Sequence, residues 1–343
     1  MKVAVLAGGS GPGLPGRPDG PSPDVVGRMP DAGPMPETRL LQFPALGGSR
    51  NLVVVRAGRA SLHCGWIDGP GPAGFDLLVT RYEPGPSLGE RDGHAEIGIP
   101  GRKIAGFARL FREHPALLAN YDFIALLDDD LRVSQQDLER LFAFGDRYGL
   151  DLFQPSLSWA SHFTYAAVLR NPHCRLRYTN VVEMMCPVFR TAHLRRALPL
   201  FDLSAETGID LLWCRLTDRP RLRYAIVDDV AVTHTRPVGA TKQRQGFPEG
   251  ETYDGQIGEL LDRFGARFTG IVTYAAIDAA GRRIESRLPI ALRSLVLCRA
   301  WHVTPMPKRH FVRFLTDYIR HCLSRPLNFD QVDLSRANTR RAG

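Results

Sequence analysis

The sequence has few of the features that mark membrane, secreted or nucleic-acid-binding proteins. No segment reaches the roughly 18 consecutive apolar residues that a membrane-spanning helix requires. The six cysteines are widely spaced, with no C-x-x-C pair or Cys/His cluster, which argues against a zinc site or disulfide framework and predicts reduced thiols in a cytoplasmic protein. Lysine and arginine form no long block, so nucleic acid is not an expected partner. The formal net charge of +8 nevertheless predicts attraction to anions such as nucleotide phosphates or anionic lipid.

Residues 1–49 lack the apolar patterning of a folded domain. Residues 1–9 look like the strand and glycine loop that begin a sugar nucleotidyltransferase, but residues 8–50 hold ten glycines and nine prolines. This density prevents a helix after the glycine loop and predicts a disordered N-terminal segment. We expect the N-terminus to be neither a signal peptide nor a membrane anchor, because its apolar run is only five residues long.

Residues 50–250 have the patterning of a catalytic domain. The 343 residues, 44% of them hydrophobic, can supply a substantial core. Residues 51–55 and 75–82 predict two strands with a crossover between them, which is the pattern of a βαβ unit. Residues 102–120 predict a helix with one apolar stripe. The sequence therefore predicts an α/β fold.

An apolar run ends abruptly at three consecutive carboxylates. Residues 123–127 predict a strand buried on both faces, and Asp128, Asp129 and Asp130 follow at its carboxyl end, where open α/β sheets bind ligands. Adjacent acids raise each other's pKa unless a cation offsets their charge, and a divalent metal is the simplest such cation. Helix capping is the alternative role, but Ser134 begins a capping box closer to the next helix.

Three later polar residues occur where predicted elements begin or end. Glu183 lies in a predicted apolar strand, residues 181–189, and must either pair with an arginine or point into a pocket. Asp210 begins a predicted helix, where an ordinary N-terminal acid and a site residue are both possible. His234 directly follows the strand predicted at residues 224–233, and a structural histidine and a metal ligand both remain open.

Together these features resemble glycosyltransferases of the nucleotide-diphospho-sugar type, which have the GT-A fold. The D-x-D of the acid triplet, the segment Glu206-Thr-Gly-Ile-Asp210-Leu-Leu-Trp-Cys-Arg215 and His234 follow one another as in that family. More narrowly, residues 182–189, 208–210 and 232–239 look like a family known only as a domain of unknown function. The resemblance covers roughly residues 50 to 245, and Ile209 stands where the family commonly has a Glu before the Asp.

The resemblance implies a GT-A-type three-layer α/β/α sandwich around a mixed, mostly parallel sheet. It also implies a metal-dependent transfer in which Asp130, His234 and Asp128 bind Mn²⁺ or Mg²⁺, and in which Asp210 is the general base. The remaining assignments are nucleotide-sugar binding by Asp128, Asp129, Arg56, Arg102 and Lys103, and an acceptor side with Glu183 and Trp159.

Residues 251–343 predict a C-terminal helical extension packed on the catalytic domain. Its last helix, residues 309–323, has an apolar stripe for packing and basic side chains that could instead touch the inner face of an anionic membrane. The expected partners are a nucleotide-diphospho-sugar donor and a glycan or lipid-linked acceptor. Two alternatives remain: a sugar-1-phosphate nucleotidyltransferase, and an inactive GT-A-like module that binds a glycan or a protein.

Overall fold

The computed structural model describes residues 46–84, 93–203, 205–217, 222–238 and 253–337. The predicted N-terminal segment therefore lies outside the described residues, apart from residues 46–49. The strands are β1 (Asn51–Ala57), β2 (Asp76–Arg81), β3 (His94–Gly98), β4 (Phe123–Asp128), β5 (Leu131–Arg132), β6 (Leu152–Leu157), β7 (Cys174–Thr179), β8 (Val188–Arg190), β9 (Tyr224–His234), β10 (Thr273–Asp278) and β11 (Arg283–Ile284).

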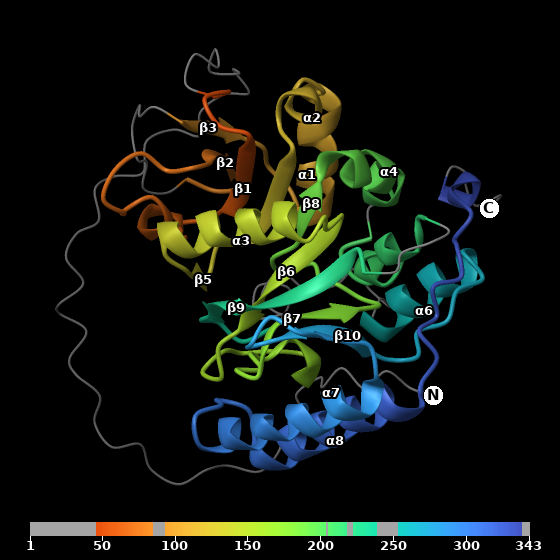
Figure 1. Cartoon of the computed structure of the whole chain (residues 1–343). Helices are drawn as coiled ribbons and strands as arrows, with labels where there is room; N and C mark the ends of the chain where they lie inside the picture. Colours follow the sequence, from red (N-terminus) through yellow and green to blue (C-terminus); the bar gives the residue numbers. More distant parts are fainter. Residues whose placement is uncertain (1–45, 85–92, 204, 218–221, 239–252, 338–343) are drawn as a thin grey trace, which may run out of the picture.

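Helices lie between and after the strands (Figure 1). The α-helices are α1 (Lys103–Glu113), α2 (Leu117–Asn120), α3 (Gln135–Arg147), α4 (Thr191–Phe201), α6 (Tyr253–Arg263), α7 (Arg287–Ser294) and α8 (Lys308–Ser324). Short 3-10 helices are η2 (His63–Trp66), η3 (Ala166–Val168), η4 (Ile209–Leu211), η5 (Trp213–Arg215), η6 (Leu295–His302) and η7 (Leu334–Ala337).

The strands form one large mixed sheet in the order β11-β10-β7-β9-β6-β8-β4-β1-β2-β3, and β5 pairs with the end of β9. The four strands β4-β1-β2-β3 are parallel to one another, and β6 is parallel to β9. The other pairs are antiparallel and more numerous, because β8 inserts antiparallel between β4 and β6, and β7 and β10 run antiparallel to their neighbours. The predicted α/β fold with a large mixed sheet is confirmed, and the antiparallel pairs among the described strands are mostly short.

Helices cover both faces of the sheet, as the three-layer prediction required. Val53 and Val55 of β1 belong to the core shared with α3 and α8, whereas Leu52 and Val54 belong to the core shared with α1 and α4. Successive side chains of a strand point to opposite faces, so a continuous apolar run such as β1 is stable only when both faces are covered.

The C-terminal extension contains the predicted helices α7 and α8, which lie side by side along one end of the molecule (Figure 1). It is not only helical, however. Strand β10 pairs with β7, and β11 pairs with β10, so residues beyond 250 extend the sheet of the preceding domain. The sheet therefore continues across the boundary expected at residue 250.

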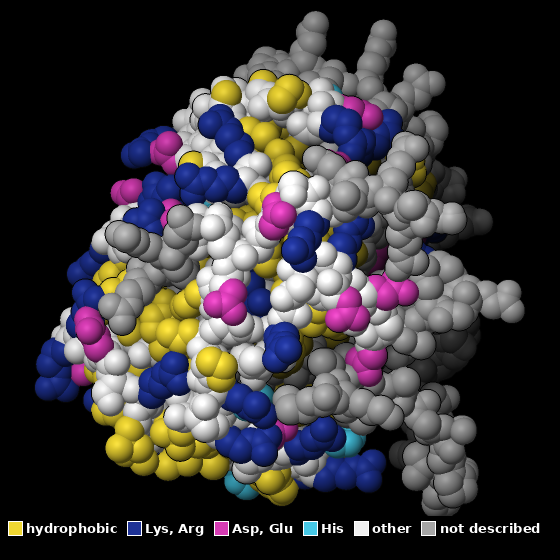
Figure 2. All heavy atoms as spheres, turned by 90° about the vertical axis from the view of Figure 1, so that its right-hand side faces the viewer, with side chains coloured by type: hydrophobic (Ala, Val, Ile, Leu, Met, Phe, Trp, Pro, Cys, Tyr) yellow, Lys and Arg dark blue, Asp and Glu magenta, His cyan; other side chains and the backbone are white. Residues whose placement is uncertain are grey.

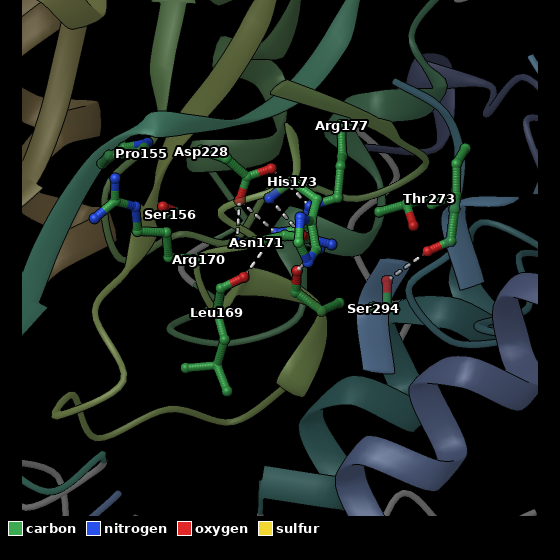
Figure 3. A network of polar contacts seen from close by, with 12 residues as sticks. Pro155, Ser156, Leu169, Arg170, Asn171, His173, Arg177, Asp228, Thr273 and Ser294 are labelled. Atoms are coloured by element: carbon green, nitrogen blue, oxygen red, sulfur yellow. Dashed lines mark hydrogen bonds and ion pairs between the residues drawn. The ribbon is translucent and has the colours of Figure 1, made fainter. Parts of the chain in front are cut away.

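A buried ion pair ties the second half of the sheet to α8 (Figure 3). Arg177 of β7 donates to both carboxylate oxygens of Asp228 on β9, at 2.7 and 2.9 Å. It also donates to the carbonyls of Ala167 and Leu169 and to the hydroxyl of Tyr318, at 2.7, 2.7 and 2.8 Å. The negative charge of Asp228 outweighs the effect of burial and raises the pKa of Arg177, which stays charged inside the core.

Candidate functional site

Sheet topology brings the acid triplet and His234 together. Strands β1 and β4 are parallel and in register, with Arg56 opposite Asp128, so both end at the same edge of the sheet. The chain turns at Asp129 and Asp130, and β5 then pairs antiparallel with β9, which places Leu131 opposite His234. Residues about 100 positions apart in the sequence therefore meet beyond the carboxyl end of β4, the edge at which open α/β sheets bind ligands.

Asp130 and His234, the two principal predicted metal ligands, lie in direct contact. His234 Nε2 is 3.1 Å from Asp130 Oδ2, and His234 Nδ1 is 2.9 Å from the carbonyl of His162, to which it donates. Burial opposes charge on both groups, but their hydrogen bond and mutual attraction outweigh it. They raise the pKa of His234 and lower the pKa of Asp130, which favours the charged form of each group.

Asp129 is held by the loop after β1 and by Arg236, which was not among the predicted site residues. The backbone N–H of Gly58 donates to its Oδ2 at 2.8 Å, and Arg236 Nη1 lies 3.2 Å from its Oδ1. Burial outweighs these contacts and raises the pKa of Asp129. Arg236 could have been considered from its place, because it follows the end of β9 by two residues, at the edge of the sheet where ligands were expected.

Asp128 lies against the start of α1. Lys103 Nζ is 2.5 Å from Asp128 Oδ1 and also donates to the carbonyl of Met184. Arg102 is exposed at the N-cap of the same helix. The carboxylate of Glu206 accepts hydrogen bonds from the first turn of α1, where Ile104 N lies 3.2 Å from it. Glu206, the first residue of the segment that resembles the family motif, therefore caps this helix.

Each acid of the triplet thus lies beside a basic side chain: Lys103, Arg236 or His234. These contacts offset part of the repulsion between the three acids, although the charges of Asp128 and Asp130 still contribute to the raised pKa of Asp129. Within the residues that the structure describes, no group of three or more His, Cys, Asp or Glu side chains is arranged to hold a metal ion.

Arg56, which the resemblance assigned to the nucleotide-sugar, contacts backbone carbonyls. Its guanidinium is buried and donates to the carbonyls of Ile99 and Gly101, each at 2.7 Å. Burial lowers its pKa to about 10, which still leaves it charged at neutral pH. Arg56 therefore holds the chain that leads into α1 and so positions Lys103.

Glu183 lies in the acid cluster, although the strand predicted around it is wrong. Only Val188–Arg190 forms a strand, β8, because residues 181–187 follow the edge of β4 through single hydrogen bonds such as Asp128 N to Met185 O, at 3.0 Å. Glu183 is buried, and its Oε2 accepts no hydrogen bond from any described group. Burial, reinforced by the charge of Asp210, raises its pKa to about 8.

Asp210 contacts the same segment. Its Oδ2 accepts from the backbone N–H of Met184 at 3.3 Å, and the residue is buried. The predicted helix start is a pair of 3-10 turns, η4 and η5, preceded by Gly208 at φ +84°, a conformation that favours glycine. The acid positions are brought together although the expected helix does not form.

Trp159 lies in the loop that runs beside the end of β9. Its Nε1 donates to the carbonyl of Arg170 at 2.9 Å, and the neighbouring Ser158 hydroxyl contacts the hydroxyl of Thr233 at 2.8 Å. None of these contacts joins Trp159 to the acids, so its place on the acceptor side remains a prediction.

No protein-family model matches this chain, and no curated protein matches it in sequence. Among solved structures, S. aureus TarS 1-349 in complex with UDP-GlcNAc is 12% identical, with a TM-score of 0.35, and the match covers 80% of this chain and 72% of that one. TarS 1-349 in complex with UDP is 11% identical, with a TM-score of 0.39, and the match again covers 80% of this chain and 72% of that one. A197 from STIV is 11% identical, with a TM-score of 0.33, and the match covers 69% of this chain and 94% of that one. Likenesses this weak identify neither a family nor a function.

Proposed function

We propose that the chain is a metal-dependent glycosyltransferase of the GT-A type, moving a sugar from a nucleotide-diphospho-sugar to an acceptor hydroxyl. The observation that carries this proposal is a pair of buried carboxyl oxygens, Asp130 Oδ1 and Glu183 Oε2, that have no hydrogen-bond partner among the described groups. Buried polar atoms are normally paired, so unpaired acceptors at the ligand-binding edge of a sheet favour a site that is completed by bound molecules. The motif order adds the resemblance to glycosyltransferases.

Asp130 and His234 offer donor atoms that fit Mn²⁺ or Mg²⁺. Carboxylate oxygens suit both ions, and an imidazole nitrogen favours Mn²⁺. The hydrogen bond from His234 Nδ1 to a carbonyl directs Nε2 toward Asp130, which is the usual arrangement of a metal-binding histidine. One or two protein ligands are enough where phosphates and water complete the coordination. Such an ion would act as a Lewis acid on the leaving diphosphate.

The other residues of the cluster have roles that their contacts support. Lys103 and Arg236 provide positive charge beside the triplet, where the donor phosphates would bind. Asp210 takes the proton of the acceptor hydroxyl as general base. Glu183 stays protonated at neutral pH because its pKa is about 8, so it can donate a hydrogen bond to the acceptor, which we propose is a glycan or a lipid-linked sugar.

A thermal-shift panel of nucleoside diphosphates and nucleotide-sugars, with and without Mn²⁺, tests the proposal. We expect at least one nucleotide-sugar to raise the melting temperature only with Mn²⁺, because a ligand that binds only the folded state stabilises it by mass action. Asp130→Asn should abolish that shift, and Asp202→Asn, an exposed acid beyond α4, should retain it. If no donor binds with Mn²⁺ present, the proposal is wrong.

The two alternatives are separated by the products formed. A nucleotidyltransferase would release pyrophosphate from a sugar-1-phosphate and a nucleoside triphosphate, but residues 1–9, on which that alternative rests, lie outside the described residues. An inactive binding module would bind a donor without consuming it. We propose the cytoplasm as the compartment, because all six cysteines are free thiols.

A further inference from the structure

Exposed apolar side chains gather on the C-terminal helices. Figure 2 shows hydrophobic and basic side chains next to one another at the lower end of the molecule, where α7 and α8 lie in Figure 1. Of the nine large hydrophobic residues exposed in the described chain, seven belong to this region: Leu288, Leu292, Leu295, Trp301, Val303, Val312 and Leu323.

The leucines follow helical spacing on the side of α7 and η6 that faces away from the sheet. Leu288, Leu292 and Leu295 are 56%, 58% and 49% exposed, whereas Ile290 and Ala291 on the opposite side are buried. Positions i, i+4 and i+7 share one face of a helix. These leucines therefore form an apolar stripe that the core of the protein does not use.

The excess of positive over negative charge in the sequence lies in the same region. Residues 281–325 contain ten Lys and Arg against two acids, whereas the rest of the chain contains 34 of each, so this region accounts for the whole net charge of +8. Among the described residues, neither Arg299 nor Arg309 lies within ion-pair distance of a carboxylate. Lys308 Nζ lies 5.3 Å from the centre of the Trp301 ring.

We propose that this apolar and basic face of α7, η6 and α8 docks on the surface of an anionic phospholipid bilayer. A stripe of leucines flanked by arginines is the composition of helices that lie in the membrane interface, with apolar side chains among the acyl chains and cations at the head groups. Tryptophan and lysine are likewise typical of that interface. In the described part of the chain no helix is long and apolar enough to cross a membrane, so the contact would be peripheral.

Vesicle sedimentation with the purified full-length protein tests the docking. Vesicles of phosphatidylcholine with phosphatidylglycerol should bind the protein at least tenfold more tightly than phosphatidylcholine alone, and the difference should shrink as salt is raised. Equal affinity for both vesicles, or binding to neither, would overturn the proposal. If the protein binds neither kind of vesicle, a protein partner becomes the expected occupant of this face.

Matched variants locate the contact. Arg299→Gln with Arg309→Gln should weaken binding about fivefold per residue, equivalent to ~1 kcal/mol for each cation near an anionic surface. Leu292→Gln with Leu295→Gln should weaken it at least as much, whereas Leu292→Met with Leu295→Met should not. The charge control is Arg147→Gln with Arg196→Gln, two exposed arginines on α3 and α4, which should bind as the unaltered protein does. Equal binding by all variants would contradict the assigned face.

A probe on Cys298 gives a readout that does not depend on affinity. Cys298 is an exposed thiol between Leu295 and Arg299 on the proposed face. An environment-sensitive fluorophore there should shift to shorter wavelength when anionic vesicles are added. A sedimenting protein whose fluorophore shows no shift would bind through another surface, and the proposal would fail.

Discussion

Two buried charged clusters in this protein differ in how completely their polar atoms are paired. At the Arg177–Asp228 pair both side chains are fully buried, and every nitrogen of the guanidinium donates a hydrogen bond (Figure 3). At the end of β4, Asp130 and Glu183 are also buried, but one oxygen of each accepts no hydrogen bond from the described chain.

The difference separates a structural cluster from a candidate binding site. A buried charge with all its hydrogen bonds made within the protein contributes to one arrangement of the chain and leaves nothing for a ligand. A buried carboxyl oxygen without a partner lowers stability, and a bound ligand is one explanation for its presence. Substitutions at the first cluster should therefore affect folding, and those at the second should affect binding and turnover.

The largest effect is expected at the paired cluster. Asp228→Asn leaves the Arg177 guanidinium buried without a counter-charge, so the free energy of unfolding should fall by about 3 to 5 kcal/mol. Urea titration monitored by circular dichroism measures this change. The double variant Arg177→Met with Asp228→Leu should recover most of the loss, because it removes both charges together. A loss equally large in the double variant would show that hydrogen bonding, and not charge, carries the stability.

At the unpaired cluster the expected effect is on rate. Asp210→Asn keeps an oxygen that can accept from Met184 N but cannot take a proton, so turnover with saturating donor should fall about 10²- to 10⁴-fold. The melting temperature and donor affinity of Asp210→Asn should stay near those of the unaltered protein. The control is Asp146→Asn, at an exposed acid on α3, in which turnover, melting temperature and donor affinity should all be unchanged. Full activity in Asp210→Asn would remove Asp210 from the role of base.

The sequence predicted the ends of strands better than the path of the chain between them. Residues 123–127 predicted β4 because a continuous apolar run fits a strand covered on both faces, and Ser134 was expected to cap α3. Its hydroxyl does accept from Asp137 N, at 3.1 Å. Both signals are local, so neither needed knowledge of distant residues.

Partners from distant parts of the chain could not be predicted in the same way. The pairing of β5 with β9 sets the contact between Asp130 and His234, and no local pattern encodes that register. For Arg56, in contrast, the sequence suggested a ligand where the structure has contacts within the protein. The resemblance implied that Arg56 binds the nucleotide-sugar, but the carbonyls that accept from its guanidinium come from a loop more than 40 residues away. The Arg177–Asp228 pair was missed because each residue alone is an ordinary charged residue in a strand.

The smallest effect, and the sharpest test of the contrast between the clusters, is the pH dependence caused by Glu183. Its pKa is raised to about 8 from the ordinary 4.5. Between these two values the folded protein keeps a proton that the unfolded chain releases, so Glu183 makes the free energy of unfolding fall as pH rises. The fall should total about 3 kcal/mol between pH 4.5 and 8, after allowing for partial relaxation of the site.

Glu183→Gln should remove that contribution, because the amide matches the protonated carboxyl in shape and does not titrate. Urea unfolding at several pH values from 5 to 8 should then give a flatter profile for the variant, with the gain in stability greatest near pH 8. Glu113→Gln, on the exposed side of α1, controls for the loss of one carboxylate. Turnover at pH 7 should survive in Glu183→Gln, since the proposed hydrogen-bond donor remains. An unchanged pH profile would mean that Glu183 is ionised in the folded protein and is paired as Asp228 is, and the contrast between the two clusters would then disappear.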